Sequence, residues 1–169
     1  TNVPNYEKKY KKYVKRVSFL TKYLENIQTF ISKEIQGKGT RILFDAIYGT
    51  GAVSLSKLAK MYELNNFTTI HSKHDAFFGF MLPSPSKENM LLNKKKLLKD
   101  NYDLALGIDS DGDRLGILDE FGNFVDSNEI LAALYYYLVK YRNEKGDIVK
   151  NCATSNLVDN VAKKLGFEC

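Results

Sequence analysis

Cysteine, proline and long apolar runs are scarce in this sequence of 169 residues, which has two cysteines and three prolines. Cys152 and Cys169 provide neither a disulfide framework nor a metal-ligand spacing, so we expect a reducing, cytoplasmic location. No apolar run approaches the roughly 20 residues that a membrane-spanning helix requires. The polar, lysine-rich N-terminus lacks the pattern of a signal peptide. We therefore expect no membrane partner.

The charge balance is moderately basic, with 25 lysines and arginines against 20 aspartates and glutamates and a net charge of +5. A basic balance can indicate a nucleic-acid partner. The lysines, however, gather at residues 8–16 and 94–96, in segments with a helical pattern. Such a run is more often a solvated helix face. We therefore expect no nucleic acid among the partners.

The length suits one domain, and the shares of hydrophobic residues (44%) and charged residues (27%) are ordinary for a globular fold. Because the first residue is Thr1, we expect the sequence to begin inside a longer chain, or to follow processing or a tag. Apolar residues between Tyr6 and Ile31 recur at steps of three and four, which predicts a helical segment over residues 1–36. Ser18 could serve as an N-cap that divides this segment in two.

Short apolar segments alternate with helical periodicity after residue 37. Strands are predicted at residues 41–46, 68–70, 104–108 and 148–152, with a β-hairpin formed by residues 115–118 and 124–125. Helices are predicted at residues 52–64, 87–100, 127–142 and 155–165. This order predicts an α/β fold: a three-layer α/β/α sandwich with a mainly parallel sheet.

Single residues mark the faces and ends of these helices. Asp126 and Glu129 have the spacing of a capping box, and Gly166 is expected to end the last helix. The buried side of the helix over residues 87–100 is predicted to consist of four leucines, Leu91, Leu92, Leu97 and Leu98.

The clearest functional signal is the sequence DSDGDR at residues 109–114, directly after a predicted strand. In an open α/β sheet, ligands bind beyond the carboxyl ends of the strands. Asp109, Asp111 and Asp113 stand at alternate positions, so their carboxylates can converge, and their mutual repulsion favours a bound divalent cation. Mg²⁺ prefers such oxygen ligands. Arg114 adds a planar donor suited to phosphate or sugar oxygens.

Loops of three different kinds share parts of this pattern. Aspartate and glycine favour turns, so it could be a polar surface loop. An EF-hand calcium loop begins D-x-D-x-D, and Glu120 falls at its twelfth place, but its sixth place requires glycine and here holds Arg114. A haloacid-dehalogenase-type phosphatase carries D-x-D-G after a strand, with Asp109 then as the nucleophile. That motif normally opens the chain, whereas here a βαβ unit precedes it. This phosphatase is the alternative enzyme.

The loop resembles the D-G-D-G-D-R magnesium loop of the α-D-phosphohexomutases, the phosphoglucomutase/phosphomannomutase superfamily, with Ser110 where the first glycine usually stands. The resemblance runs over roughly residues 40–142 and covers the second domain of that family. Its other segments are the strand and turn at residues 44–51, the loop with the family's aspartate, phenylalanine and P-x-P motif at residues 75–79 and 83–85, and the hairpin at residues 116–122.

The resemblance implies a division of the chain. Residues 1–36 would join a first domain, residues 37–145 would form the second, metal-binding domain, and residues 146–169 would begin the third domain or form a last βα unit. The other domains of the same chain would then be its partners. The catalytic serine loop, the sugar-recognition loop and the distal phosphate-binding loop of the family have no counterpart here, so no catalytic residue is expected within this sequence.

The resemblance also implies an activity, namely the interconversion of hexose 1-phosphate and 6-phosphate through a phosphoserine and a bisphosphate intermediate. Asp109, Asp111 and Asp113 would hold Mg²⁺ as the cofactor. Arg114 would bind the substrate or its phosphate, so the small-molecule partners would be a sugar phosphate and a hexose bisphosphate. The identity of the sugar is left open.

The remaining motifs are weaker. Residues 49–51 (GTG) read as a tight strand-to-helix turn, because they lack the third glycine of a dinucleotide fingerprint. His71 and His74 lie near Asp75 and could form a second metal site, although a proline-rich loop with stray polar residues is more common. A non-catalytic binding module that kept the fold is the third functional hypothesis.

Overall fold

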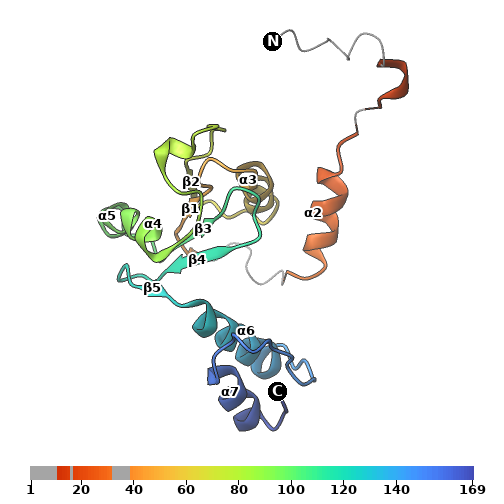
Figure 1. Cartoon of the computed structure of the whole chain (residues 1–169), viewed down its shortest axis with the longest axis vertical. Helices are drawn as coiled ribbons and strands as arrows, with labels where there is room; N and C mark the ends of the chain where they lie inside the picture. The colour runs from red at the N-terminus through yellow and green to blue at the C-terminus, as the bar shows by residue number, and fades with distance from the viewer. Residues whose placement is uncertain (1–10, 16, 32–38) are drawn as a thin grey trace.

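A five-stranded sheet lies at the centre of the computed structural model, which describes residues 11–15, 17–31 and 39–169. The strand order is β2-β1-β3-β4-β5 (Figure 1). β1 pairs in parallel with β2 and β3, whereas β4 and β5 continue the sheet as an antiparallel hairpin. The strands are β1 (Ile42–Asp45), β2 (Phe67–Ile70), β3 (Leu104–Ile108), β4 (Leu115–Leu118) and β5 (Phe124–Val125).

Helices cover both faces of this sheet. None of the helices in the described part of the chain is both long and apolar enough to cross a membrane. The α-helices are α2 (Leu20–Gln28), α3 (Gly51–Met61), α4 (Lys87–Leu92), α5 (Lys94–Lys99), α6 (Ser127–Tyr141) and α7 (Leu157–Leu165), and two 3₁₀ turns are η1 (Lys11–Tyr13) and η3 (Phe78–Phe80).

Successive side chains of β1 enter two separate cores, because neighbouring residues of a strand point to opposite faces. Phe44 packs with Ala52 of α3 on one face. Leu43 packs with Met90 of α4 and Leu97 of α5 on the other. The chain therefore forms the predicted three-layer α/β/α sandwich (Figure 1).

The N-terminal segment is more divided than one long helix. Its described part holds η1 and α2, with Val17 and Ile31 of the stripe outside both helices, while Tyr6 and Tyr10 lie outside the described residues. Helix α2 begins after Phe19, which makes no side-chain cap hydrogen bond, so the prediction of Ser18 as the N-cap is wrong. Among the described residues of the stripe, Leu24 is the buried one, and α2 packs beside α3.

The helix predicted over residues 87–100 is two helices, α4 and α5, which meet at Asn93. The side chain of Asn93 is buried and donates a hydrogen bond to Oδ2 of Asp45 at 2.8 Å. Asp45 is the last residue of β1, so the partner that fixes this position lies far away in the sequence. Helical periodicity alone could not reveal the break.

The break also changes which leucines are buried. Leu97 is fully buried, as predicted, and Met90 joins it in the same core cluster. Leu91, Leu92 and Leu98 are 38%, 65% and 45% exposed, so the prediction that they belong to the buried side is wrong.

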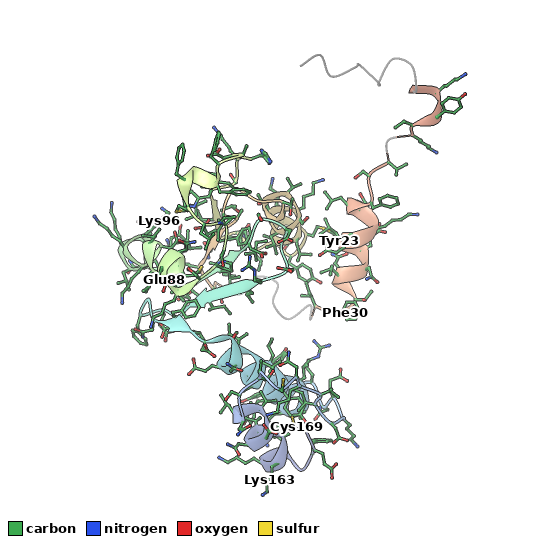
Figure 2. The ribbon with its side chains drawn as sticks, viewed as in Figure 1. Tyr23, Phe30, Glu88, Lys96, Lys163 and Cys169 are labelled. Atoms are coloured by element: carbon green, nitrogen blue, oxygen red, sulfur yellow. The ribbon has the colours of Figure 1, made fainter. Side chains whose placement is uncertain are left out.

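The capping box predicted at the start of α6 is confirmed. Asp126 accepts a hydrogen bond from the Asn128 N–H at 2.9 Å, and Glu129 accepts one from the Asp126 N–H at 3.0 Å. Helix α7 ends at Gly166 in the left-handed conformation, also as predicted. α6 and α7 pack against each other beyond β5; Lys163 belongs to α7, and Cys169 follows α7 at the end of the chain (Figures 1 and 2).

Residues 148–152 do not form the predicted strand and instead belong to the connection between α6 and α7. The Ile148 N–H donates to the carbonyl of Glu168 at 3.0 Å, while the side chain of Val149 is 94% exposed. An apolar segment becomes a strand only where a neighbour pairs with its backbone. None of the described strands lies beside this segment, so its composition was misleading.

We expect Leu97→Ala and Leu98→Ala to differ sharply in stability, although the two residues are adjacent and identical. Leu97 is fully buried, so its truncation should lower the free energy of unfolding by roughly 2–5 kcal/mol. Leu98 is 45% exposed, so its truncation should lower the free energy of unfolding by less than about 1 kcal/mol. Urea denaturation measures both midpoints. Equal losses in the two variants would contradict the described packing of α5.

Candidate metal centre

Three loops meet at one edge of the sheet, because β1, β2 and β3 are parallel and end on the same side. They comprise residues 46–50, 71–86 and 109–114. Hydrogen bonds join the third loop to each of the other two. The loop with the aspartates therefore lies at the edge where open α/β sheets bind ligands.

Asp109 organises the loop over residues 109–114 from a fully buried position. Its Oδ1 accepts hydrogen bonds from the backbone N–H groups of Gly112, Asp113 and Arg114 at 2.9, 2.9 and 3.1 Å. Its Oδ2 accepts one from Nε of Arg114 at 2.7 Å. Burial by itself favours the neutral carboxyl, but these hydrogen bonds outweigh it and hold the pKa of Asp109 well below its usual range.

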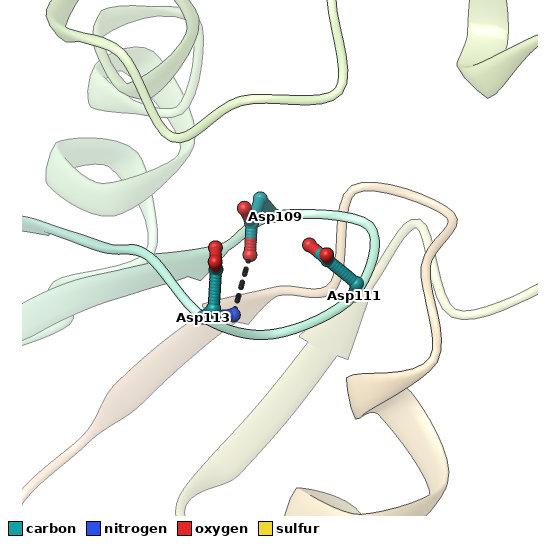
Figure 3. Close-up of side chains that lie close together, drawn as sticks. All are labelled: Asp109, Asp111 and Asp113. Carbon is teal, nitrogen blue, oxygen red and sulfur yellow. Dashed lines mark hydrogen bonds between the residues drawn. The ribbon is translucent and has the colours of Figure 1, made fainter.

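The carboxylates of Asp111 and Asp113 lie close to that of Asp109 (Figure 3). Each of the three residues offers an oxygen atom, and these oxygens all lie within 4.8 Å of one another. The adjacent Asp109 carboxylate, helped by the charge of Asp111, raises the pKa of Asp113. The loop therefore brings the three predicted ligands together, while their role in binding an ion stays a prediction.

The chemistry of this cluster fits a hard divalent cation. All its donors are carboxylate oxygens, the ligand type that Mg²⁺ and similar ions bind. Asp111 and Asp113 are exposed, so both can adjust to an ion. Gly112 has a φ of +83°, which glycine adopts without strain and which allows the tight turn. Among the described residues, Arg114 is the basic side chain paired with the cluster, so negative charge remains in excess.

Arg114 bridges the aspartates and the second loop. Its Nε lies 2.7 Å from Oδ2 of Asp109 and 3.6 Å from Oδ1 of Asp113. Its Nη1 donates a hydrogen bond to Oγ of Ser84 at 3.2 Å. The hydrogen bond to Asp109 is the largest contribution that raises the pKa of Arg114. The side chain is nevertheless 60% exposed, so the guanidinium stays accessible to an anion.

The turn after β1 supports the aspartate loop from one side. The N–H and hydroxyl of Thr50 both donate to the carbonyl of Ser110, at 2.9 and 3.2 Å. A Cβ atom at Gly49 would lie 2.6 Å from the Cα and O atoms of Ser110. This close approach of two backbones explains Gly49, and the GTG segment forms the predicted tight turn between β1 and α3.

A pair of glycines in the sheet supports the second loop. Gly107 of β3 and Gly116 of β4 are directly paired. A Cβ atom at either position would collide with Met90, and one at Gly116 would also lie 2.6 Å from the carbonyl oxygen of Pro85. Because these glycines have no side chains, the segment around Pro85 lies flat on the sheet. Ser84 is thereby brought within reach of Arg114.

Asp45 is a structural residue that the sequence pattern did not single out. Its Oδ1 accepts hydrogen bonds from the Ile47 N–H and from Nδ1 of His71, both at 2.9 Å, and its Oδ2 accepts the bond from Asn93. The second metal site that His71, His74 and Asp75 could have formed, which was the less favoured interpretation, does not form among the described residues, because His71 contacts Asp45 and stacks on Tyr48. The available signals were its place as the aspartate of the strand-and-turn motif at residues 44–51 and its position at the end of an apolar strand, and neither revealed these contacts.

We expect Gly49→Ala to displace the aspartate loop, because the added methyl group meets backbone atoms of Ser110 that cannot move independently. The cost should be roughly 1–3 kcal/mol of unfolding free energy, with shifted amide resonances at residues 109–114. Gly39→Ala is the matched control, since a Cβ atom there meets nothing within 4 Å. Urea denaturation and ¹⁵N–¹H spectra test both. Unchanged resonances in the Gly49 variant would refute the described contact.

Residues 21–122, more than half of the chain, match a family described as "Phosphoglucomutase/phosphomannomutase, alpha/beta/alpha domain II". A protein named probable phosphoglucosamine mutase from Pyrococcus horikoshii is 32% identical over 140 residues, which cover 82% of this chain and 30% of that protein. A phosphopentomutase from Thermococcus kodakarensis is 26% identical over 153 residues, covering 90% of this chain and 33% of that protein.

The fold matches solved structures as well. A phosphoglucomutase/phosphomannomutase family protein from Burkholderia thailandensis superposes with a TM-score of 0.78 at 20% identity, over 91% of this chain and 33% of that chain. The chain thus spans about a third of the length of these relatives. The family match includes the whole aspartate loop and overturns the haloacid-dehalogenase interpretation. The chain belongs to the phosphoglucomutase/phosphomannomutase family, and its residues 21–122 correspond to the α/β/α domain II of that family.

Proposed function

We propose that this chain is the metal-binding domain of an enzyme that interconverts the 1-phosphate and 6-phosphate of a hexose through a phosphoserine and a bisphosphate intermediate. The observation that carries the proposal is the convergence of three carboxylates beside an accessible arginine, at the ligand-binding edge of a phosphohexomutase domain II. The relatives are named for glucosamine and pentose phosphates as well as for hexoses, so the proposed substrate class is a sugar phosphate.

Asp109, Asp111 and Asp113 are the proposed ligands of Mg²⁺. The bound ion would supply positive charge next to the phosphate that is transferred. Asp109 would contribute in a second way, because its backbone hydrogen bonds keep the loop in the shape that presents the other two carboxylates. Asp111 and Asp113 reach the site from the exposed side, where a phosphate would arrive.

Arg114 is the proposed ligand for the substrate or its phosphate. A guanidinium has several donors in a fixed plane, which suits the oxygens of a phosphate. Asp109 and Ser84 hold Arg114 from two directions while the side chain stays largely exposed. The side chain is thus positioned before a ligand binds, which lowers the entropic cost of binding.

The remaining machinery belongs to other parts of the proposed enzyme. The serine nucleophile and the sugar-recognition and distal phosphate loops have no counterpart in this sequence, and the chain spans about a third of its relatives. We place residues 1–36 at a junction with a first domain and residues 146–169 at the start of a third. The 169-residue chain should then have no mutase activity of its own, because no productive geometry can form without the nucleophile.

The alternative in this family is a non-catalytic binding module that kept the fold. A module of that kind would have no need for the aspartates to act on phosphate. The two hypotheses differ in what happens when one exposed carboxylate is removed from the complete protein.

We expect Asp111→Ala in the complete enzyme to lower turnover by at least about 100-fold, because electrostatic stabilisation of the transferred phosphate would be lost. Glu120→Ala is the matched control, since it removes an exposed carboxylate from the adjacent hairpin without touching the cluster. The assay follows conversion of a hexose 1-phosphate to its 6-phosphate with the bisphosphate added.

Full activity of the Asp111 variant would sink the proposed role of the loop. Turnover by residues 1–169 alone would contradict the proposed division of labour among domains. Circular dichroism of both variants checks that a lost activity does not come from a lost fold.

A further inference from the structure

The carboxylate of Asp109 has little acceptor capacity left for an ion. A carboxylate offers about four lone-pair directions on its two oxygens. Oδ1 accepts three backbone N–H groups at 2.9–3.1 Å, which more than fills its share. Oδ2 accepts a single donor, Nε of Arg114, at 2.7 Å. If Asp109 contributes a ligand atom to a cation, that atom is therefore Oδ2.

At that oxygen, a cation and the guanidinium of Arg114 compete. The Nε atom of Arg114 also lies 3.6 Å from Oδ1 of Asp113, so the guanidinium sits between two of the three carboxylates. A divalent ion bound to those carboxylates would stand next to a like charge at short range, which is strongly repulsive. Oδ2 keeps one free lone pair beside Nε of Arg114, so it is the repulsion between the two positive charges that would favour one cation at this oxygen at a time.

Ser84 gives Arg114 a second anchor that does not involve a carboxylate. Its Oγ accepts from Nη1 of Arg114 at 3.2 Å. The Ser84 backbone is fixed, because it stands between Pro83 and Pro85 and its carbonyl accepts from the side chain of Asn89 at 2.7 Å. The guanidinium can therefore leave Asp109 and still be held at the mouth of the site.

Building on the proposed ion site, we propose that Arg114 and a divalent cation alternate at Oδ2 of Asp109. In the absence of the cation, Arg114 neutralises the buried carboxylate. When the cation binds, Nε of Arg114 leaves Oδ2, and the side chain remains attached through Nη1 to Ser84. The freed Nε–H then becomes available to a phosphate. Ion binding would thus prepare the arginine for substrate, with Ser84 as a positioning residue.

The test is a titration of the 169-residue chain with Mg²⁺ alone, followed by NMR of arginine side chains. The Nε–H resonance of Arg114, assigned by its loss in Arg114→Lys, reports its hydrogen bond to Asp109. The backbone amides of Gly112 and Asp113 report the ion independently. We expect all three resonances to change with one common midpoint through the millimolar range.

The possible outcomes separate the two proposals. Backbone amides that respond while the Nε–H of Arg114 stays unchanged would overturn the exchange and leave the ion site intact. If neither the backbone amides nor the Nε–H of Arg114 responds to Mg²⁺, both proposals are overturned. A joint response supports both, and because it uses the unmodified chain it does not depend on the folding of a variant.

Variants add a measurement of affinity by calorimetry. Arg114→Gln should tighten Mg²⁺ binding several-fold, since the competitor is removed, whereas Arg142→Gln removes the same charge at the C-terminal end of α6 and should have no effect. Ser84→Ala should leave the Mg²⁺ affinity nearly unchanged, because the bond from Nη1 of Arg114 to Ser84 is made before and after the exchange. The guanidinium of this variant should instead become mobile once Mg²⁺ is bound, while Ser72→Ala serves as the control in the same loop. A guanidinium of Arg114 that stays equally ordered in the Mg²⁺-loaded Ser84 variant would overturn the role proposed for Ser84.

Discussion

The burial of one carboxylate, that of Asp109, is the constraint on which the rest of the site depends. An ionised carboxylate is stable away from water only when its oxygens are hydrogen-bonded or paired with a cation. Four donors from residues 112–114 surround it. Three of them are backbone amides of the same loop, so the loop wraps around the Asp109 carboxylate. Asp111 and Asp113 then project from a backbone whose path is already fixed.

A loop wound this tightly needs neighbours that approach its backbone closely. Gly49 meets Ser110 from one side, and the glycine pair Gly107 and Gly116 lets the segment around Pro85 lie flat on the sheet. Because these glycines have no side chains, the loops at residues 46–50 and 71–86 can pack closely and fix the position of the aspartate loop. Arg114 links two of these loops, because it contacts Asp109 in its own loop and Ser84 in the segment after β2.

The features that were predicted correctly depend on residues a few positions apart. The convergence of the aspartates after β3, the hairpin and the capping box of α6 are of this kind. The features that were missed depend on partners far away in the sequence. The break at Asn93 follows from its contact with Asp45, 48 positions earlier, and Ser84 reaches Arg114 across 30 positions. The segment at residues 148–152 has the composition of a strand, but composition does not specify a pairing partner.

The hairpin connection of the aspartate loop has a consequence for domain motion. Because β3 and β4 are adjacent and antiparallel, all three carboxylates come from one short connection between two paired strands. Their mutual geometry is internal to a rigid body and does not change when that body rotates or translates. An ion bound by the three carboxylates would therefore move together with this domain. Movement of this domain relative to other domains would change only those ligands of the ion that the other domains provide.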